Sequence, residues 1–189
     1  MTGFRVVGSR TVSQAGFISL TEEQVEGPGD ETFTRVAVRH PGAIVMVPVE
    51  DDRESVLMVR QFRAAPAREL LEVPAGKRDV EGEAPEATAV RELEEEIGRH
   101  PGRLVPLCEF YNSPGFCDEY THLFAALDLA DLGAPRTVTA EEHEMTVERV
   151  RLADVDGLIA AREIVDAKSI IGLQLTRRYL AGEFEGIVD

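Results

Sequence analysis

The segment from Pro85 to Gly98 constrains the fold of this chain most, because the sequence indicates its start, its end and its buried face. Proline is tolerated in the first turn of a helix, and glycine commonly follows the last turn in a left-handed conformation. Four apolar residues between them recur at helical spacing: Ala87, Val90, Leu93 and Ile97. We therefore predict a helix from Pro85 to about Ile97 that packs this face against a core, with Gly98 as its C′ residue.

The same helix places three carboxylates on one side. Glu92, Glu95 and Glu96 are three and four positions apart, so they fall within an arc of about 100°, whereas Glu94 points elsewhere. A solvated glutamate face is one interpretation. However, Glu95 and Glu96 lie in the last turn, where negative charge is unfavourable beside the helix dipole. A divalent cation would remove that penalty, and ligands that are all oxygen suit magnesium or manganese rather than zinc.

The chain is strongly acidic, with 35 Asp and Glu against 20 Lys and Arg and a formal net charge of −15. Such a surface repels phosphate backbones, and no basic run is longer than two residues, as in Arg177-Arg178 inside an amphipathic segment. We therefore expect no nucleic-acid partner. An acidic protein that handles phosphates needs bound metal or a few placed arginines to bridge the like charges.

Compartment and redox state are also constrained by the sequence. No run approaches the roughly 18 apolar residues of a membrane helix, and the first residues lack the apolar region of a secretory signal. We therefore expect a cytoplasmic protein with no membrane partner. Cys108 and Cys117 show no zinc-ligand spacing, and we interpret them as reduced thiols.

At 189 residues the chain fits one domain with a small N-terminal extension. Alternating or β-branched runs predict strands at 4–7, 17–20, 33–39, 43–49, 55–61, 104–111, 120–127 and 146–152. Polar loops are expected at 77–83 and 128–142, and further helices near 153–162 and 167–181. The predicted fold class is α/β (α+β), a mixed β-sheet between helices. Residues 1–39 would form an N-terminal extension of strands, and residues 40–189 the main domain.

The segment from Gly76 to Arg99 closely resembles the Nudix box, G-x5-E-x7-R-E-U-x-E-E-x-G-U, where U is a bulky apolar residue. From Glu83 onward the spacing matches, with seven residues to Arg91 and then R-E-L-E-E-E-I-G. Two positions depart from the pattern. Six residues rather than five separate Gly76 from Glu83, and Arg99 occupies the last apolar position. The extra residue lies in a loop, where insertions cost little, and neither departure removes a candidate ligand.

The resemblance implies the Nudix fold and a hydrolase whose box glutamates hold Mg²⁺ or Mn²⁺ against a substrate diphosphate. The matching metal ligands are Glu92 and Glu96, with Glu95 beside them and the carbonyl of Ala75 as a further ligand. Bound Mg²⁺ neutralises the diphosphate oxygens and lowers the pKa of a coordinated water. Metal would thus allow an acidic site to hold an anionic substrate.

The resemblance gives the remaining box positions structural roles. These positions are Gly76, Glu83, Arg91 and Gly98. Glu83 and Arg91 are implied to brace the loop and the helix through an ion pair.

A general base is expected outside the box. In ADP-ribose pyrophosphatases of this family it is commonly a glutamate on a loop well after the box, and the corresponding stretch here is 140–145. The candidates are Glu141 or Glu142, with Glu144 third. An acidic, solvated loop without a catalytic role is the alternative.

Residues outside the box resemble the ADP-ribose branch of the family. Pro114 lies 15 residues after Arg99, at about the distance of that branch's proline marker. The stretches 60–63 and 69–76 are similar to that branch as well. Together these features favour ADP-ribose as the substrate.

Three further residues are implied to bind that substrate. Arg63 is the candidate to bind a phosphate, because a guanidinium can donate two parallel hydrogen bonds. The alternative is that Arg63 forms only a surface ion pair. Glu72 would lie in the same pocket, and Phe17 is a candidate for stacking on adenine.

We therefore expect Mg²⁺-dependent hydrolysis of ADP-ribose to AMP and ribose 5-phosphate. The alternatives are a Nudix hydrolase of another nucleoside diphosphate sugar, such as GDP-mannose, and a non-catalytic nucleotide-binding Nudix regulator. The strands before about Arg39 are too few to bury a core alone. In this branch they commonly pack across a homodimer and complete the substrate pocket, so a homodimer is expected.

Overall fold

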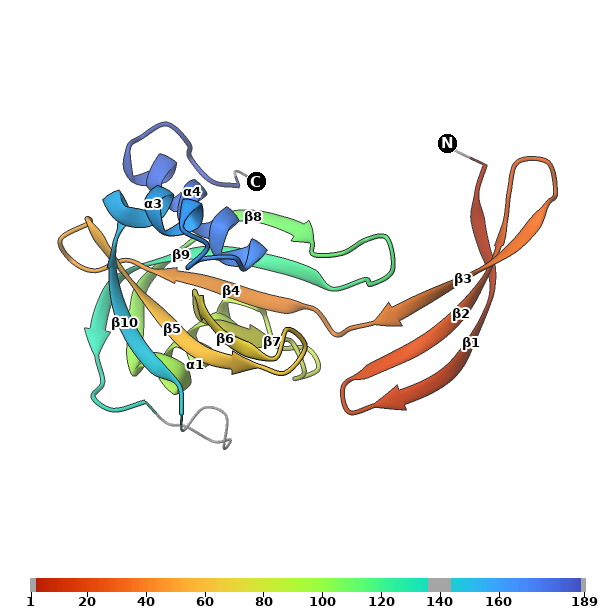
Figure 1. Cartoon of the computed structure of the whole chain (residues 1–189), viewed down its shortest axis with the longest axis horizontal. Helices are drawn as coiled ribbons and strands as arrows, with labels where there is room; N and C mark the ends of the chain where they lie inside the picture. Colours follow the sequence, from red (N-terminus) through yellow and green to blue (C-terminus); the bar gives the residue numbers. More distant parts are fainter. Residues whose placement is uncertain (1–2, 136–143, 188–189) are drawn as a thin grey trace. The chain divides into compact units, whose positions relative to one another are not determined.

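The computed structural model describes residues 3–135 and 144–187, which form strands and a smaller number of helices (Figure 1). The chain divides into two compact units, Met1–Gly42 with Phe110–Thr121 and Ala43–Glu109 with His122–Asp189. The predicted α+β class is confirmed. Within the described ranges no helix is long and apolar enough to cross a membrane.

The first unit contains an antiparallel sheet of β1 (Arg5–Ala15), β2 (Ile18–Glu26) and β3 (Thr32–Arg39). The first two strands are longer than the predicted runs 4–7 and 17–20. Cross-strand ion pairs explain the extra length, because Arg5 pairs with Glu26 and Arg10 with Glu22 on opposite strands. Opposite charges facing each other support pairing where the apolar pattern is weak.

The second unit contains two sheets. One has the order β10-β5-β6, from β10 (Thr146–Arg151), β5 (Ser55–Arg63) and β6 (Arg68–Glu72). The other has the order β7-β4-β9-β8, from β7 (Ala75–Lys77), β4 (Ala43–Pro48), most of β9 (Tyr120–Asp131) and most of β8 (Arg99–Tyr111). The prediction of a loop beginning at Lys77 was wrong by one residue, because Lys77 pairs with Ala43 in β7.

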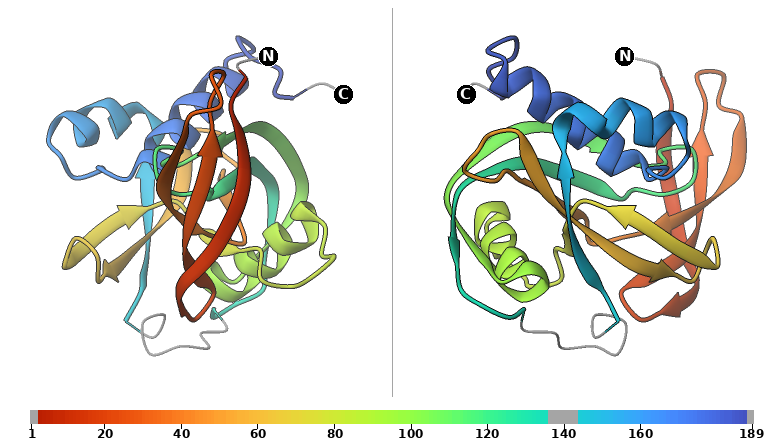
Figure 2. Two further views of the ribbon diagram at one scale, coloured as in Figure 1. Left: turned by 90° about the vertical axis from the view of Figure 1, so that its right-hand side faces the viewer. Right: turned by 60° about the vertical axis from the view of Figure 1, so that its left-hand side comes forward.

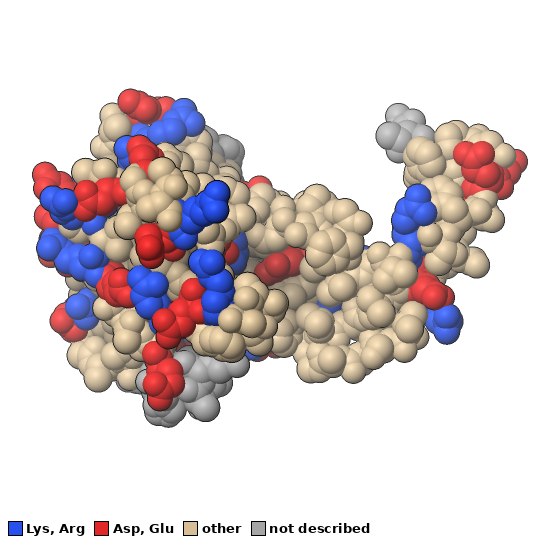
Figure 3. Space-filling view, in the orientation of Figure 1, with Lys and Arg blue, Asp and Glu red and all other residues tan. Residues whose placement is uncertain are grey.

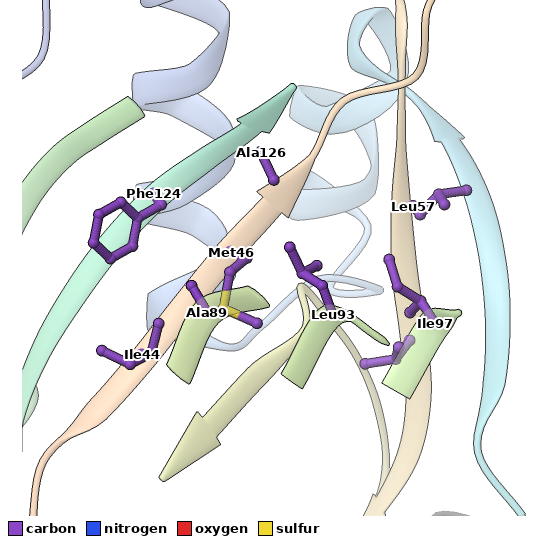
Figure 4. Close-up of a cluster of buried hydrophobic side chains, with 9 residues drawn as sticks. Ile44, Met46, Leu57, Ala89, Leu93, Ile97, Phe124 and Ala126 are labelled. Atoms are coloured by element: carbon purple, nitrogen blue, oxygen red, sulfur yellow. The ribbon is translucent and has the colours of Figure 1, made fainter. Parts of the chain in front are cut away.

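Helices lie on both faces of the β4 sheet in the second unit (Figure 2). They are α1 (Pro85–Ile97), η1 (Leu152–Asp154), α3 (Val155–Ala160) and α4 (Ala167–Leu180). Side chains alternate along β4, so its two faces meet different helices. Met46 packs in a cluster with Leu93 of α1 (Figure 4), whereas Val47 lies close to Gly172 of α4.

The predicted limits of α1 are confirmed, but its predicted buried face was partly wrong, because Val90 is only half-buried and Ala87 lies outside that face. The helix runs from Pro85 to Ile97, and Gly98 follows it with φ 63°, in the left-handed region. Ala87 is exposed and Ala89 is buried. Ala89 lies about 40° from Leu93 around the helix axis, whereas Ala87 lies about 120° away, outside the stripe that faces the core.

Candidate active site

The carboxylate of Glu92 lies directly against the backbone of Gly76. A Cβ atom built on Gly76 would be 2.1 Å from Cδ and 2.5 Å from Oε1 of Glu92. Contacts this short do not occur between real atoms, so any larger residue at position 76 would displace the carboxylate. Glycine is therefore required here by a close side-chain approach, and φ at this position is not positive.

Glu96 reaches the same stretch of backbone one residue earlier. The amide of Ala75 donates a hydrogen bond to Oε2 of Glu96 at 3.1 Å. Pairing of β7 with β4, in which Ala75 lies opposite Val45, fixes the position of that amide. The last turns of α1 and the start of β7 thus bring two of the three predicted carboxylate ligands onto Ala75 and Gly76.

The positively charged side chain of Arg91 lies between three carboxylates of the Nudix-box segment. Its Nη1 donates to Oε1 of Glu92 at 2.7 Å and to Oε2 of Glu95 at 3.4 Å. Its Nη2 donates to Oε2 of Glu83 at 3.3 Å, which is the ion pair expected from the sequence. Burial works to lower the pKa of Arg91, but Glu83 and Glu92 outweigh it and the pKa is raised.

Glu83 is further held by the hydroxyl of Thr88, which donates to Oε2 at 2.7 Å. Hydrogen bonds from Thr88 and then Arg91 lower the pKa of Glu83, so this carboxylate stays ionised. The loop before α1 is therefore tied to the first and second turns of the helix. This arrangement stabilises the helix start, where Ala84 at the N-cap provides no side-chain acceptor.

The environment of Glu92 suits a cation. Burial raises the pKa of Glu92, and the negative charges of Glu95 and Asp79 also raise it, whereas Arg91 lowers it. In residues 3–135 and 144–187 no three acidic, histidine or cysteine side chains already converge as a complete metal-binding group. Glu92 and Glu95 are instead engaged by Arg91. The all-oxygen donor set against Ala75 and Gly76 fits Mg²⁺ or Mn²⁺.

Arg63 and Glu72 form a bidentate pair on neighbouring strands of the β5–β6 sheet. Nε and Nη2 of Arg63 each donate to one carboxylate oxygen of Glu72 at 2.8 Å. Glu72 is 1% exposed, whereas the Arg63 side chain is 38% exposed. The hydrogen bonds that Arg63 donates to Glu72, the largest cause, raise the pKa of Arg63, and the charges of Glu96 and Asp166 contribute to this. Nη1 takes no part in the pair and is the donor that a ligand phosphate could use.

Two predicted substrate residues, Phe17 and Pro114, belong to the first unit. The ring of Phe17 is 51% exposed and meets His40 edge to face, with centroids 5.2 Å apart. Pro114 lines a cavity of about 430 Å³, together with Glu23, Arg39 and other residues of the same unit. The remaining described candidates lie in the second unit.

The candidates for the general base are only partly described. Glu141 and Glu142 lie outside the described residues. Glu144 is exposed in a turn directly before β10. Its position shows that the segment entering β10 is accessible to solvent.

The sequence interpretation missed a group of residues at the start of α4. Asp166 caps this helix by accepting from the amide of Ser169, and the Ser169 hydroxyl accepts from the amide of Val73. An aspartate directly before a helix was a usable signal for the cap. No local signal indicated its link to Val73, because the two segments are far apart in the sequence.

The chain is similar to known proteins in sequence and in fold. A family model described as NUDIX domain matches residues 38–170. The chain is 38% identical over 170 residues to an ADP-ribose pyrophosphatase of Bacillus subtilis (strain 168), a match covering 90% of each chain. It is 35% identical over 170 residues to an ADP-ribose pyrophosphatase of Mycobacterium tuberculosis, covering 90% of this chain and 81% of the relative. The fold resembles the crystal structure of an ADP compounds hydrolase, with a TM-score of 0.80, 22% identity and 95% of both chains covered.

Proposed function

Because this chain belongs to the Nudix family, we propose that it hydrolyses the diphosphate of ADP-ribose to AMP and ribose 5-phosphate with the help of Mg²⁺. The observation that carries the proposal is the placement of Glu92 and Glu96 on the backbone of Ala75 and Gly76. ADP-ribose is favoured over other nucleoside diphosphates because the two relatives reported above are ADP-ribose pyrophosphatases.

The residues that would hold the metal are Glu92 and Glu96, with Glu95 beside them and the carbonyl of Ala75. When bound, Mg²⁺ neutralises diphosphate oxygens and acidifies a coordinated water. The chain's own contribution is to present carboxylates at fixed positions. Arg91 supports this role, because it donates hydrogen bonds to Glu92 and Glu95 and so holds the two carboxylates close together.

Substrate binding is assigned to Arg63, with Glu72 as the group that orients it. A buried carboxylate that binds Nε and Nη2 restricts rotation of the guanidinium and directs Nη1 away from itself. A phosphate oxygen can then accept from Nη1 without breaking the pair. Phe17 and Pro114 are proposed to contact the nucleoside part of the substrate.

The general base is proposed to be a glutamate of the loop before β10. Glu141 and Glu142 remain the first candidates, with Glu144 third. A carboxylate is a group that can accept a proton from the attacking water.

We further propose that residues 1–39 serve in dimerisation and in completing the substrate pocket of a homodimer. Large apolar side chains are at least 46% exposed on or beside the three-stranded sheet, namely Phe4, Val6, Val7, Val12, Phe17 and Val36. On the face that Figure 3 shows, uncharged surface predominates on this unit, although the ion pairs Arg5–Glu26 and Arg10–Glu22 also lie on its sheet. Contiguous exposed apolar surface is typical of interaction sites. Sedimentation velocity at micromolar concentration should give the mass of two chains, and a monomer would contradict this assignment.

The activity is tested with a panel of substrates in the presence of Mg²⁺ and after chelation. Initial rates on ADP-ribose, GDP-mannose, diadenosine polyphosphates and NADH are compared, with AMP and ribose 5-phosphate measured as products. We expect ADP-ribose among the best substrates and loss of its hydrolysis with EDTA. Faster turnover of GDP-mannose would favour the nucleotide-sugar alternative. Binding without turnover of any substrate would favour a non-catalytic regulator.

A further inference from the structure

The short segment between β6 and β7 connects two different sheets. β6 pairs with β5 and ends at Glu72, whereas β7 pairs with β4 and begins at Ala75. Val73 lies between them and is 0% exposed, so water cannot satisfy its amide. A buried amide without a partner would be costly, and this one donates to the hydroxyl of Ser169 at 2.9 Å.

Ser169 is itself fixed by the cap of α4. Its hydroxyl donates to Oδ2 of Asp166 at 2.7 Å, and its amide donates to the same oxygen at 2.9 Å. Lys168 donates to Oδ1 of Asp166 at 2.6 Å. Burial works to raise the pKa of Asp166, but Lys168 and Ser169 outweigh it and the pKa is lowered. The ionised Asp166 thus directs the hydroxyl proton of Ser169 to itself, which leaves an oxygen lone pair for Val73.

The residue next to Val73 is Glu72, the buried partner of Arg63. The position of the Glu72 carboxylate depends on the backbone at Val73, because Glu72 has no freedom to adjust at 1% exposure. Asp166 also acts on Arg63 directly through its charge. Two independent effects therefore connect the start of α4 with the guanidinium.

We propose that Ser169 and Asp166 are positioning residues for Arg63, acting through Val73 and Glu72. They set the direction in which the guanidinium presents Nη1 to a substrate phosphate. This inference rests on the proposed function, in which Arg63 binds a phosphate of the substrate.

The test is the variant Ser169→Ala, measured with ADP-ribose and saturating Mg²⁺. We expect KM to rise about tenfold, on the scale of one buried hydrogen bond, with kcat changed by less than about threefold. The matched control is Thr176→Val on the same helix. Thr176 is also fully buried, and its hydroxyl has no hydrogen-bond partner among the described residues. Its removal should leave KM unchanged.

A double-mutant cycle with Arg63→Ala separates positioning from general destabilisation. If Ser169 acts through Arg63, adding Ser169→Ala to Arg63→Ala raises KM no further. If the increases in KM caused by the two substitutions multiply in the double variant, the inference is overturned, while the phosphate role of Arg63 stays intact. An unchanged KM in Arg63→Ala alone would overturn both that role and the inference. If Ser169→Ala does not fold, Asp166→Asn replaces it in the same cycle, because asparagine still caps a helix but lacks the charge.

Discussion

Replacing Gly76 by alanine should damage catalysis far more than stability. The new Cβ would lie 2.1 Å from Cδ of Glu92, so the carboxylate must retreat by roughly 1.5 Å to reach ordinary van der Waals contact. A misplacement of this size in a catalytic group can reduce the rate about 10²-fold, which corresponds to about 2.7 kcal/mol. The backbone of Gly76 is not in the left-handed region, so alanine can adopt it.

The assay measures kcat/KM for ADP-ribose, the Mn²⁺ concentration that gives half the maximal rate, and the melting temperature. For Gly76→Ala we expect kcat/KM to fall about 10²-fold and the half-saturating Mn²⁺ concentration to rise. The melting temperature should change by only a few degrees. The control is Gly157→Ala, the same chemical change at a helical position with no atom within 4 Å, which should leave the rate unaltered.

Two results would refute this reasoning about Gly76. Normal activity in Gly76→Ala would mean that the position of Glu92 does not matter for catalysis. A lower rate with unchanged Mn²⁺ dependence and a large loss of melting temperature would mean that the substitution acts on folding. The first result would remove Glu92 from the proposed metal site, and the second would refute the claim that Gly76→Ala damages catalysis more than stability.

Three other substitutions test the metal site, the N-terminal sheet and the core. Glu96→Gln should lower the rate of hydrolysis by orders of magnitude. The melting temperature should change little, since an amide oxygen can still accept the hydrogen bond from the backbone of Ala75. An unchanged rate would contradict the metal assignment. Hydrogen bonds from Thr21 and then Arg39 lower the pKa of Glu23 to about 2 from its ordinary 4.5. This stabilisation is complete above pH 4.5 and is lost as the pH falls towards 2. The melting temperature of Glu23→Gln should therefore lie below that of the unchanged protein above pH 4.5, and the difference should shrink as the pH falls towards 2. A difference that does not depend on pH would refute the charge interaction. Leu93→Ala should cost about 2–5 kcal/mol in urea unfolding because Leu93 is 0% exposed in the core, and a loss below about 1 kcal/mol would contradict that packing.

The sequence by itself determined the helix and its chemistry. Pro85, Gly98 and the spacing of the three box glutamates act within a few turns, where helical geometry places each side chain regardless of the rest of the fold. The ion pair between Glu83 and Arg91 was expected only from the resemblance to the Nudix box, because Glu83 lies before the helix begins. Boundaries of strands were less predictable, because the length of β1 and β2 depends on charge pairs across strands.

Only the tertiary structure decided what these glutamates face. The contact of Glu92 with Gly76 requires the pairing of β7 with β4, and the sequence interpretation placed a loop where β7 ends. The bond between Val73 and Ser169 joins residues 96 positions apart, so no local pattern could indicate it. The spacing of residues along the sequence determines which side chains share a helix face. Strand pairing and burial determine which distant backbone groups lie against that face and need a hydrogen-bond partner.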